Sequence, residues 1–208
     1  MIIVIGIILA FFAFLYFTKK NTESPKTELT KQEYRAKGTI FYHEDDFCQI
    51  EIVPRENLSE LIKEADNISD FTSENGYSDI YVREENKVSL KTKKISKSEL
   101  ESLLAKLGTE KHTEIITGYG SDYRVKSENT IGFGKDYSAV YFDFENDIVK
   151  NIWITNLYGL NHENVINTLL EIGEKWNLIM MDWNSSELID LSNKKMIEKY
   201  LNGKISKA

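Results

Sequence analysis

The sequence predicts an α+β protein, in which an N-terminal transmembrane helix precedes a largely antiparallel sheet domain with helices packed on one face. Three observations predict this class. The first eighteen residues carry no charged side chain. Farther along, pairs of short segments with alternating apolar and polar residues are joined by polar turns, a pattern typical of β-hairpins. Between these pairs, apolar residues recur at helical spacing behind Ser or Asn residues that can cap a helix.

The N-terminal segment is an apolar run from residue 2 to residue 17, followed at once by Lys19 and Lys20. A helix over its eighteen residues would rise about 27 Å, close to the ~30 Å hydrocarbon thickness of a bilayer. No Lys or Arg precedes the run and no small-residue cleavage pattern follows it, which argues against a signal peptide. A buried core helix is disfavoured because the run is apolar on every face. We therefore expect an uncleaved membrane anchor over residues 1–18.

Residues 19–38 form a polar, basic tether, with six Lys and Arg residues against three Glu. Basic segments beside a membrane span tend to stay in the cytoplasm, whereas long domains can be exported regardless of charge. We expect a single-pass membrane protein whose soluble part, residues 39–208, faces the cytoplasm, with export of the soluble part as the alternative.

The soluble part is acidic, with 20 basic and 30 acidic residues and a net charge of −10. This charge argues against nucleic acid as a ligand. It favours a basic protein partner because complementary fields speed encounter, although acidic charge also serves plain solubility. The single cysteine, Cys48, excludes an internal disulfide.

The first elements of the soluble part are predicted to be a hairpin, a helix and a second hairpin. Strands over 39–44 and 47–53 would form the first hairpin. Apolar residues at helical spacing follow over 58–68, and strands over 80–83 and 88–91 would form the second hairpin. In the strand over 47–53, the alternation assigns one apolar face to Cys48, Ile50 and Ile52.

The next helix has the strongest local signal in the chain. Ser96 and Glu99 form a capping box in front of four leucines at helical spacing, and Gly108 suits the position after the helix. A Gly- and Tyr-rich stretch over 118–134 is then expected to form turns and short strands.

The remaining segments repeat the order of the earlier ones. They are a hairpin over 138–144 and 148–155, a helix capped by Asn161, a hairpin over 178–183 and 187–191, and a helix capped by Ser192. One interpretation is a duplicated hairpin-helix-hairpin-helix unit, with halves at 39–108 and 137–203.

The densest group of potential metal ligands is His43-Glu44-Asp45-Asp46. Neighbouring residues on a strand alternate faces, so these four side chains cannot converge on one ion. The segment is interpreted as a solvated turn or as an acidic edge that faces a protein partner.

A second acidic group, Asp143, Glu145 and Asp147, lacks the glycine and the terminal Glu of a calcium loop. We expect no metal there, and Asp143 and Glu145 are candidates for partner binding instead. Cys48 shares the apolar face of its strand, where a buried, unreactive thiol is the usual finding.

The glycine pairs around Tyr119 and Phe133 are not phosphate loops because the residues that such loops require are missing. We expect no cofactor and no catalytic residue. If Tyr119 and Phe133 lie on loop tips, they are candidate interface anchors, because rigid aromatic side chains contribute much of the energy of interfaces.

The segment His43-Glu44-Asp45-Asp46-Phe47-Cys48-Gln49-Ile50-Glu51-Ile52-Val53-Pro54, followed by a helix at Asn57-Leu58, resembles the opening of small α+β immunity proteins of bacterial polymorphic-toxin systems. The hairpin around Tyr141-Phe142-Asp143-Phe144 is similar in style. Such proteins are not enzymes but bind a cognate toxin and block it. The resemblance implies that role here, with the anchor holding the inhibitor where the toxin arrives. The alternatives are a membrane-tethered binding or scaffold domain of the envelope, and an enzyme with an unrecognised site.

Overall fold

The computed structural model describes residues 40–75, 82–83, 85–119 and 123–205. The predicted anchor over 1–18 and the tether over 19–38 lie outside these ranges. Within them, no helix combines the length and the hydrophobicity that crossing a bilayer would require.

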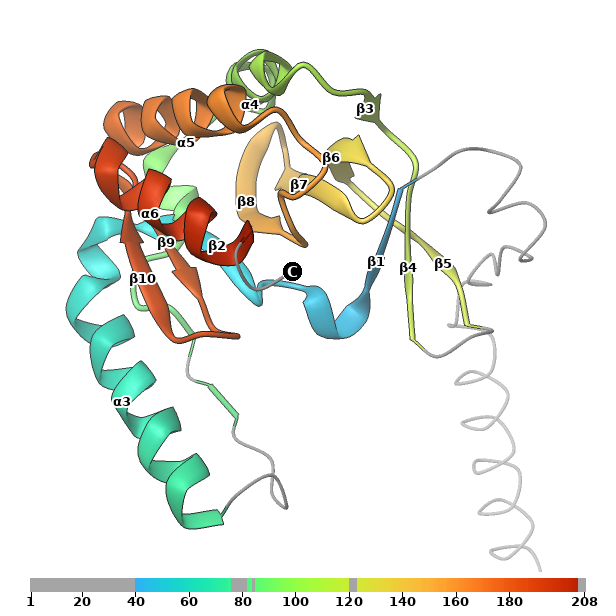
Figure 1. Ribbon diagram of the computed structural model, residues 1–208. Helices are drawn as coiled ribbons and strands as arrows, with labels where there is room; N and C mark the ends of the chain where they lie inside the picture. Colours follow the sequence, from blue (N-terminus) through green and yellow to red (C-terminus); the bar gives the residue numbers. More distant parts are fainter. Residues whose placement is uncertain (1–39, 76–81, 84, 120–122, 206–208) are drawn as a thin grey trace, which may run out of the picture.

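A seven-stranded antiparallel sheet forms the centre of the fold, with the strand order β10-β9-β2-β8-β7-β6-β3. A small second sheet has the order β1-β4-β5, in which β1 runs parallel to β4. The predicted α+β class with a large antiparallel sheet is confirmed (Figure 1). The strands are β1 Phe41–His43, β2 Ile50–Pro54, β3 Lys111–His112, β4 Ile115–Gly118, β5 Val125–Ser127, β6 Thr130–Lys135, β7 Ser138–Glu145, β8 Ile148–Ile154, β9 Leu178–Asp182 and β10 Glu187–Asp190.

Three helices cover one face of the large sheet and enclose the main apolar core (Figure 1). They are α4 (Lys97–Leu104), α5 (His162–Trp176) and α6 (Lys194–Ile205). Short 3-10 helices η3 (Leu90–Lys93) and η4 (Ala105–Leu107) complete this layer. The inner faces of the helices are apolar at helical spacing, so burying them against the sheet is the main source of their stability. Their buried residues include Leu100, Leu104, Val165, Leu169, Ile172 and Ile197.

The opposite face of the sheet is also covered, so the prediction of helices on one face only is wrong. Helix α3 (Leu58–Asn75) packs its Leu61 against Val53, Ile179 and Met181 of β2 and β9. At the other end, Ile40, Tyr42 of β1 and Ile115 of β4 pack against β7 and β8. The central strands are therefore apolar on both faces, which a period-2 pattern does not reveal.

The first predicted hairpin is wrong, because β1 and β2 belong to different sheets. Between them lie the 3-10 helix η1 (Glu44–Asp46) and Cys48, whose backbone is left-handed with φ +56°. This local reversal carries the chain from the small sheet to the large one. It also removes Cys48 from the face of Ile50 and Ile52 and places it against the cluster that contains Tyr42.

The second predicted hairpin is also not found. Residues 80–81 lie outside the described ranges, Val88 lies in a bend, and residues 90–91 belong to η3. The buried side chain of Asn57 donates to the Val88 carbonyl and accepts from the Val88 N–H, both at 2.8 Å. These bonds satisfy the backbone of Val88 in place of a strand partner.

The strongest local predictions are confirmed. Ser96 and Glu99 form a capping box at α4, and Gly108 ends the helical segment with φ +71°. The hairpins β7–β8 and β9–β10 are present, and Asn161 caps α5. Phe133 does not lie on a loop tip, which was the condition for its role as an interface anchor, but is buried in β6. Its neighbour Gly134 is required for packing, since a Cβ there would lie 2.2 Å from the backbone carbonyl oxygen of Ser138.

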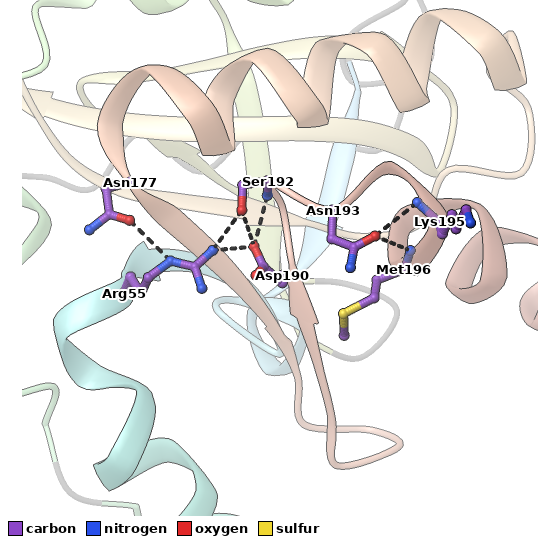
Figure 2. Close-up of polar contacts among 7 residues, drawn as sticks. All are labelled: Arg55, Asn177, Asp190, Ser192, Asn193, Lys195 and Met196. Atoms are coloured by element: carbon purple, nitrogen blue, oxygen red, sulfur yellow. Dashed lines mark hydrogen bonds and ion pairs between the residues drawn. The ribbon is translucent and has the colours of Figure 1, made fainter.

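The last helix is capped by Asn193 and not, as predicted, by Ser192. Figure 2 shows the Asn193 side chain accepting the backbone N–H groups of Lys195 and Met196, at 3.1 and 3.3 Å. Ser192 donates its hydroxyl to Asp190 at 2.7 Å.

Strand β2 lies between β8 and β9. A strand of the proposed first half is therefore inserted between two strands of the second half. The second half has the predicted order of hairpin, helix, hairpin and helix, but the described residues of the first half do not repeat it.

A polar cluster around Arg55 joins the ends of three elements (Figure 2). Arg55 follows β2 and donates to Asn177 at the end of α5 at 3.0 Å, to Ser192 at 3.1 Å, and to Asp190 at the end of β10. The Arg55 hydrogen bond lowers the pKa of Asp190 to about 2. Because the groups of the cluster bond to one another, we interpret it as a structural connection.

We expect Gly173→Ala to destabilise the protein. A methyl group at Gly173 in α5 would lie 2.4 Å from the carbonyl carbon of Leu191, so the helix must move away from the sheet. The expected loss is about 2–3 kcal/mol. Gly203→Ala in α6 is the matched control, because no atom lies within 4 Å of the added methyl group and the helix should gain up to about 1 kcal/mol. Urea unfolding followed by circular dichroism measures both, and equal midpoints would contradict the close packing.

We expect Asp190→Asn to lower stability by about 1 kcal/mol at pH 7. The pKa of Asp190 is depressed in the folded state, so its pair with Arg55 stabilises the fold above the ordinary Asp pKa of about 4. This contribution is lost as the pH falls toward 2, so the variant should show a shallower loss of stability between pH 4 and pH 2. Unfolding midpoints across this range provide the measurement.

The control for that experiment is Glu145→Gln, which removes an exposed carboxylate that pairs with Lys91 at 2.6 Å. Solvent screens this pair, so we expect no change in stability at pH 7. An equal effect of both variants would show that the Arg55 cluster contributes nothing beyond an ordinary surface pair.

Candidate functional site

The acidic segment singled out in the sequence forms η1, which is held by its own side chains. His43 Nδ1 accepts the N–H of Asp45 at 3.2 Å, and the Asp46 carboxylate accepts the N–H of His43 at 3.1 Å. Asp46 is therefore used as a cap. Glu44 and Asp45 are exposed, and neither pairs with a Lys or Arg among the described residues.

Phe47 follows η1 and is the residue that the sequence interpretation missed. Its side chain is 40% exposed, although its ring lies 4.8 Å, centroid to centroid, from the fully buried Trp153. The sequence contained a signal for this exposure. In the alternating pattern of the segment, Phe47 falls among the polar residues, with Gln49 and Glu51. An apolar ring among the polar residues of a strand indicates that this face of the sheet is also packed, or that the ring is exposed to solvent. Phe47 does both, because it packs on Trp153 and remains partly exposed.

The pairing of β1 with β4 brings Tyr119 to the same region. The two strands are parallel and His43 pairs with Gly118, so η1 and Tyr119 leave the small sheet at the same end (Figure 1). Tyr119 is 58% exposed, and its ring lies 5.7 Å from that of Tyr123. We define the η1 surface as Glu44, Asp45, Phe47 and Tyr119.

A polar cavity of about 520 Å³ adjoins Phe47, and buried Glu51 forms part of its wall. The Glu51 carboxylate accepts from Trp183 Nε1 at 2.7 Å, Arg83 Nη1 at 3.2 Å and Asn86 Nδ2 at 3.3 Å. The Arg83 guanidinium also lies 4.3 Å from the centre of the Trp183 ring. Glu51 is thus fully occupied and ties the loop that carries Arg83 to the sheet.

Cys48 and Asp143 lie behind the η1 surface and are not part of it. Burial, with help from the charges of Glu51 and Asp143, raises the pKa of the Cys48 thiol. Burial also raises the pKa of Asp143, whose carboxylate accepts from the backbone and side-chain nitrogens of Asn151 at 2.9 and 3.0 Å. A protonated thiol is a poor nucleophile, so Cys48 is suited to packing and not to attack.

The remaining predicted residues lie elsewhere. Phe133 is 2% exposed and belongs to the main core, so it cannot contact a partner. Glu145 is exposed at the end of β7, where its hydrogen bond with Lys91 lowers its pKa. Of the seven predicted partner-binding residues, the structure therefore groups Glu44, Asp45 and Tyr119 at one surface, with Asp46 supporting it.

The described residues include no group of three or more His, Cys, Asp or Glu side chains that could hold a metal ion. Comparisons with models of protein families, with curated proteins and with solved structures found no match. The η1 surface combines two exposed carboxylates with two exposed aromatic rings.

We expect Cys48 to react slowly with iodoacetamide at pH 7.5, because its raised pKa keeps it protonated. The rate should rise steeply when urea unfolds the chain, and modestly in Asp143→Asn, which removes one of the nearby negative charges. Mass spectrometry gives an unambiguous rate because the chain has one cysteine. A folded rate equal to that of the unfolded chain would contradict the burial of the thiol.

Proposed function

We propose that this chain is a bacterial immunity protein, anchored in the inner membrane by residues 1–18, that binds a basic toxin through the η1 surface and neutralises it. The observation that carries the proposal is the exposed, rigidly supported ring of Phe47 beside two carboxylates with no Lys or Arg partner among the described residues. The resemblance of the segment from His43 to Pro54 to immunity proteins implies the same role.

The η1 surface has the features of an interface hot spot. Trp153 holds the ring of Phe47 in place, so little side-chain entropy is lost when a partner covers it. Glu44 and Asp45 lie at the rim, where charges increase the rate of encounter more than the final affinity. The net charge of −10 over residues 39–208 adds a long-range attraction for a basic partner.

The position of the surface also suits this role. The chain enters the described fold at Ile40, directly before β1, and η1 follows the opposite end of that strand. The η1 surface therefore does not lie at the point where the described part of the chain begins. We propose that the basic residues of 19–38 keep this domain on the cytoplasmic side, with the periplasmic side as the alternative.

The test uses toxin candidates encoded beside the gene for this chain. Co-expression of the full-length chain should restore the growth of cells that produce the cognate toxin. Phe47→Ala should weaken binding about 10–30-fold, the loss expected for a hot-spot ring. Glu44→Lys should slow association roughly threefold at low salt and less at high salt. Surface plasmon resonance with the chain in detergent measures both.

Glu174→Lys is the matched charge control. Glu174 is exposed on α5, on the helix-covered face of the sheet, and the substitution changes the net charge by the same amount. A loss of affinity in Phe47→Ala together with normal association of Glu174→Lys would support the η1 surface. Equal slowing by the two Lys variants would mean that only the total charge matters.

The two alternatives give different outcomes in the same experiments. A partner that binds through Phe47 without affecting growth would indicate a membrane-tethered scaffold domain. Full protection by the Phe47→Ala, Glu44→Lys double variant would remove the η1 surface from the proposal. Multiple turnover of the toxin or of a small substrate by the chain would indicate an enzyme.

A further inference from the structure

A second cavity, of about 530 Å³, lies on the helix-covered side of the sheet. It is bounded by the start of β2, the end of β8, the loop over 155–161 that leads to α5, and the inner face of α6. Its volume falls in the range of sites that hold drug-sized molecules. Its apolar wall comprises Ile50, Ile154, Leu157, Leu160, Tyr200 and Leu201.

Residues that line the cavity also make polar contacts that hold its wall in place. Asn156 Nδ2 donates to the Tyr137 carbonyl at 2.7 Å, Ser138 Oγ donates to Asn156 Oδ1 at 2.6 Å, and Thr155 Oγ1 donates to the Tyr137 carbonyl at 2.7 Å. These bonds fix the loop that carries Leu157. The Tyr200 hydroxyl donates to buried Asp182 at 2.8 Å, which fixes the ring of Tyr200 in the wall. A pre-formed wall lowers the cost of binding a ligand.

The wall sets the charge of a ligand. Among the described residues that line the cavity there is no Lys, Arg, Asp or Glu, so an ionised ligand would lose its hydration without gaining a charged partner from them. One polar group of the wall needs a partner: His162 Nε2 is buried and has no hydrogen bond among the described residues. A hydroxyl or carbonyl of a ligand could supply that bond.

We propose that this cavity binds an uncharged, largely apolar small molecule that carries one hydrogen-bonding group, and that His162 bonds to that group. The site is independent of the proposed toxin binding. Ile50 faces the cavity from the helix-covered side of β2, whereas Glu51 faces the opposite side, where the η1 surface lies. The cavity and the η1 surface can therefore be occupied separately.

The test uses methyl NMR of the full-length chain in detergent micelles, titrated with three naphthalene probes. The readout is the chemical shifts of the Leu157, Leu160 and Leu201 methyl groups, so uptake of a probe by the micelle does not count as binding. Neutral 1-naphthalenemethanol should shift these methyl groups and bind at least about tenfold more tightly than anionic 1-naphthoate. It should also bind more tightly than 1-methylnaphthalene, which lacks the hydroxyl group.

Two variants test the site itself. Leu157→Trp fills the cavity and should weaken binding of the alcohol by at least about tenfold, whereas Val82→Trp adds the same ring at an exposed position and should not. His162→Phe keeps an aromatic side chain but removes the ring nitrogens. It should abolish the difference in affinity between the alcohol and 1-methylnaphthalene. If Leu157→Trp fails to fold, His162→Phe tests whether the cavity is the binding site. Changes in methyl shifts far from the cavity would reveal misfolding of Leu157→Trp.

Three results would overturn the proposal. These are an absence of shifts with the alcohol, binding of the naphthoate as tight as that of the alcohol, and retention of binding in Leu157→Trp with an intact fold. Shifts that occur only after residues 206–208 are deleted would assign the cavity to the C-terminus of the chain itself, and so would also overturn it. If His162→Phe does not change the affinity for the alcohol, His162 is not the hydrogen-bonding residue.

Discussion

The packing of Trp153 is the interaction on which the two sheets and the η1 surface depend. Its indole is fully buried, stacks on Tyr141 at 5.5 Å and meets the edges of Tyr42 at 5.3 Å and Phe47 at 4.8 Å. These three neighbours come from the large sheet, the small sheet and the chain between them. The indole N–H has no hydrogen bond among the described residues, which costs roughly 1–3 kcal/mol. The area buried by four aromatic rings outweighs this cost.

In this arrangement, the atoms that hold the η1 surface in place differ from those that are exposed on it. Phe47 contributes one side of its ring to the core and leaves the other exposed, so its position is fixed by the same packing that joins the sheets. The charges divide in a similar way: Asp46 and Glu51 are used inside the fold, while Glu44 and Asp45 remain available at its surface. A surface made in this way is rigid, and a rigid surface favours selective binding of one partner over adaptable binding of many.

The sequence predicted those parts of the fold that depend on neighbours along the chain. The capping box at Ser96 and the β7–β8 hairpin needed only local patterns. The hairpin predicted over 39–53 was wrong for two reasons. Cysteine is not a residue type that predicts a left-handed backbone, which Cys48 has, and β1 pairs with β4, which is distant in the sequence. In the candidate site, the acidic residues were found from composition. Phe133 was misassigned because its flanking glycines, which make room for packing, resemble those of a turn.

The central place of β2 has a consequence for the synthesis of the protein. Strand β2 is translated before its two neighbours in the sheet, β8 and β9. The carboxylate of Glu51 accepts a hydrogen bond from Trp183, which lies 132 residues later in the chain. Until these later segments have been made, both edges of β2 are open, and unpaired edges invite aggregation. A nascent chain therefore cannot complete this sheet until β8 and β9 have been translated.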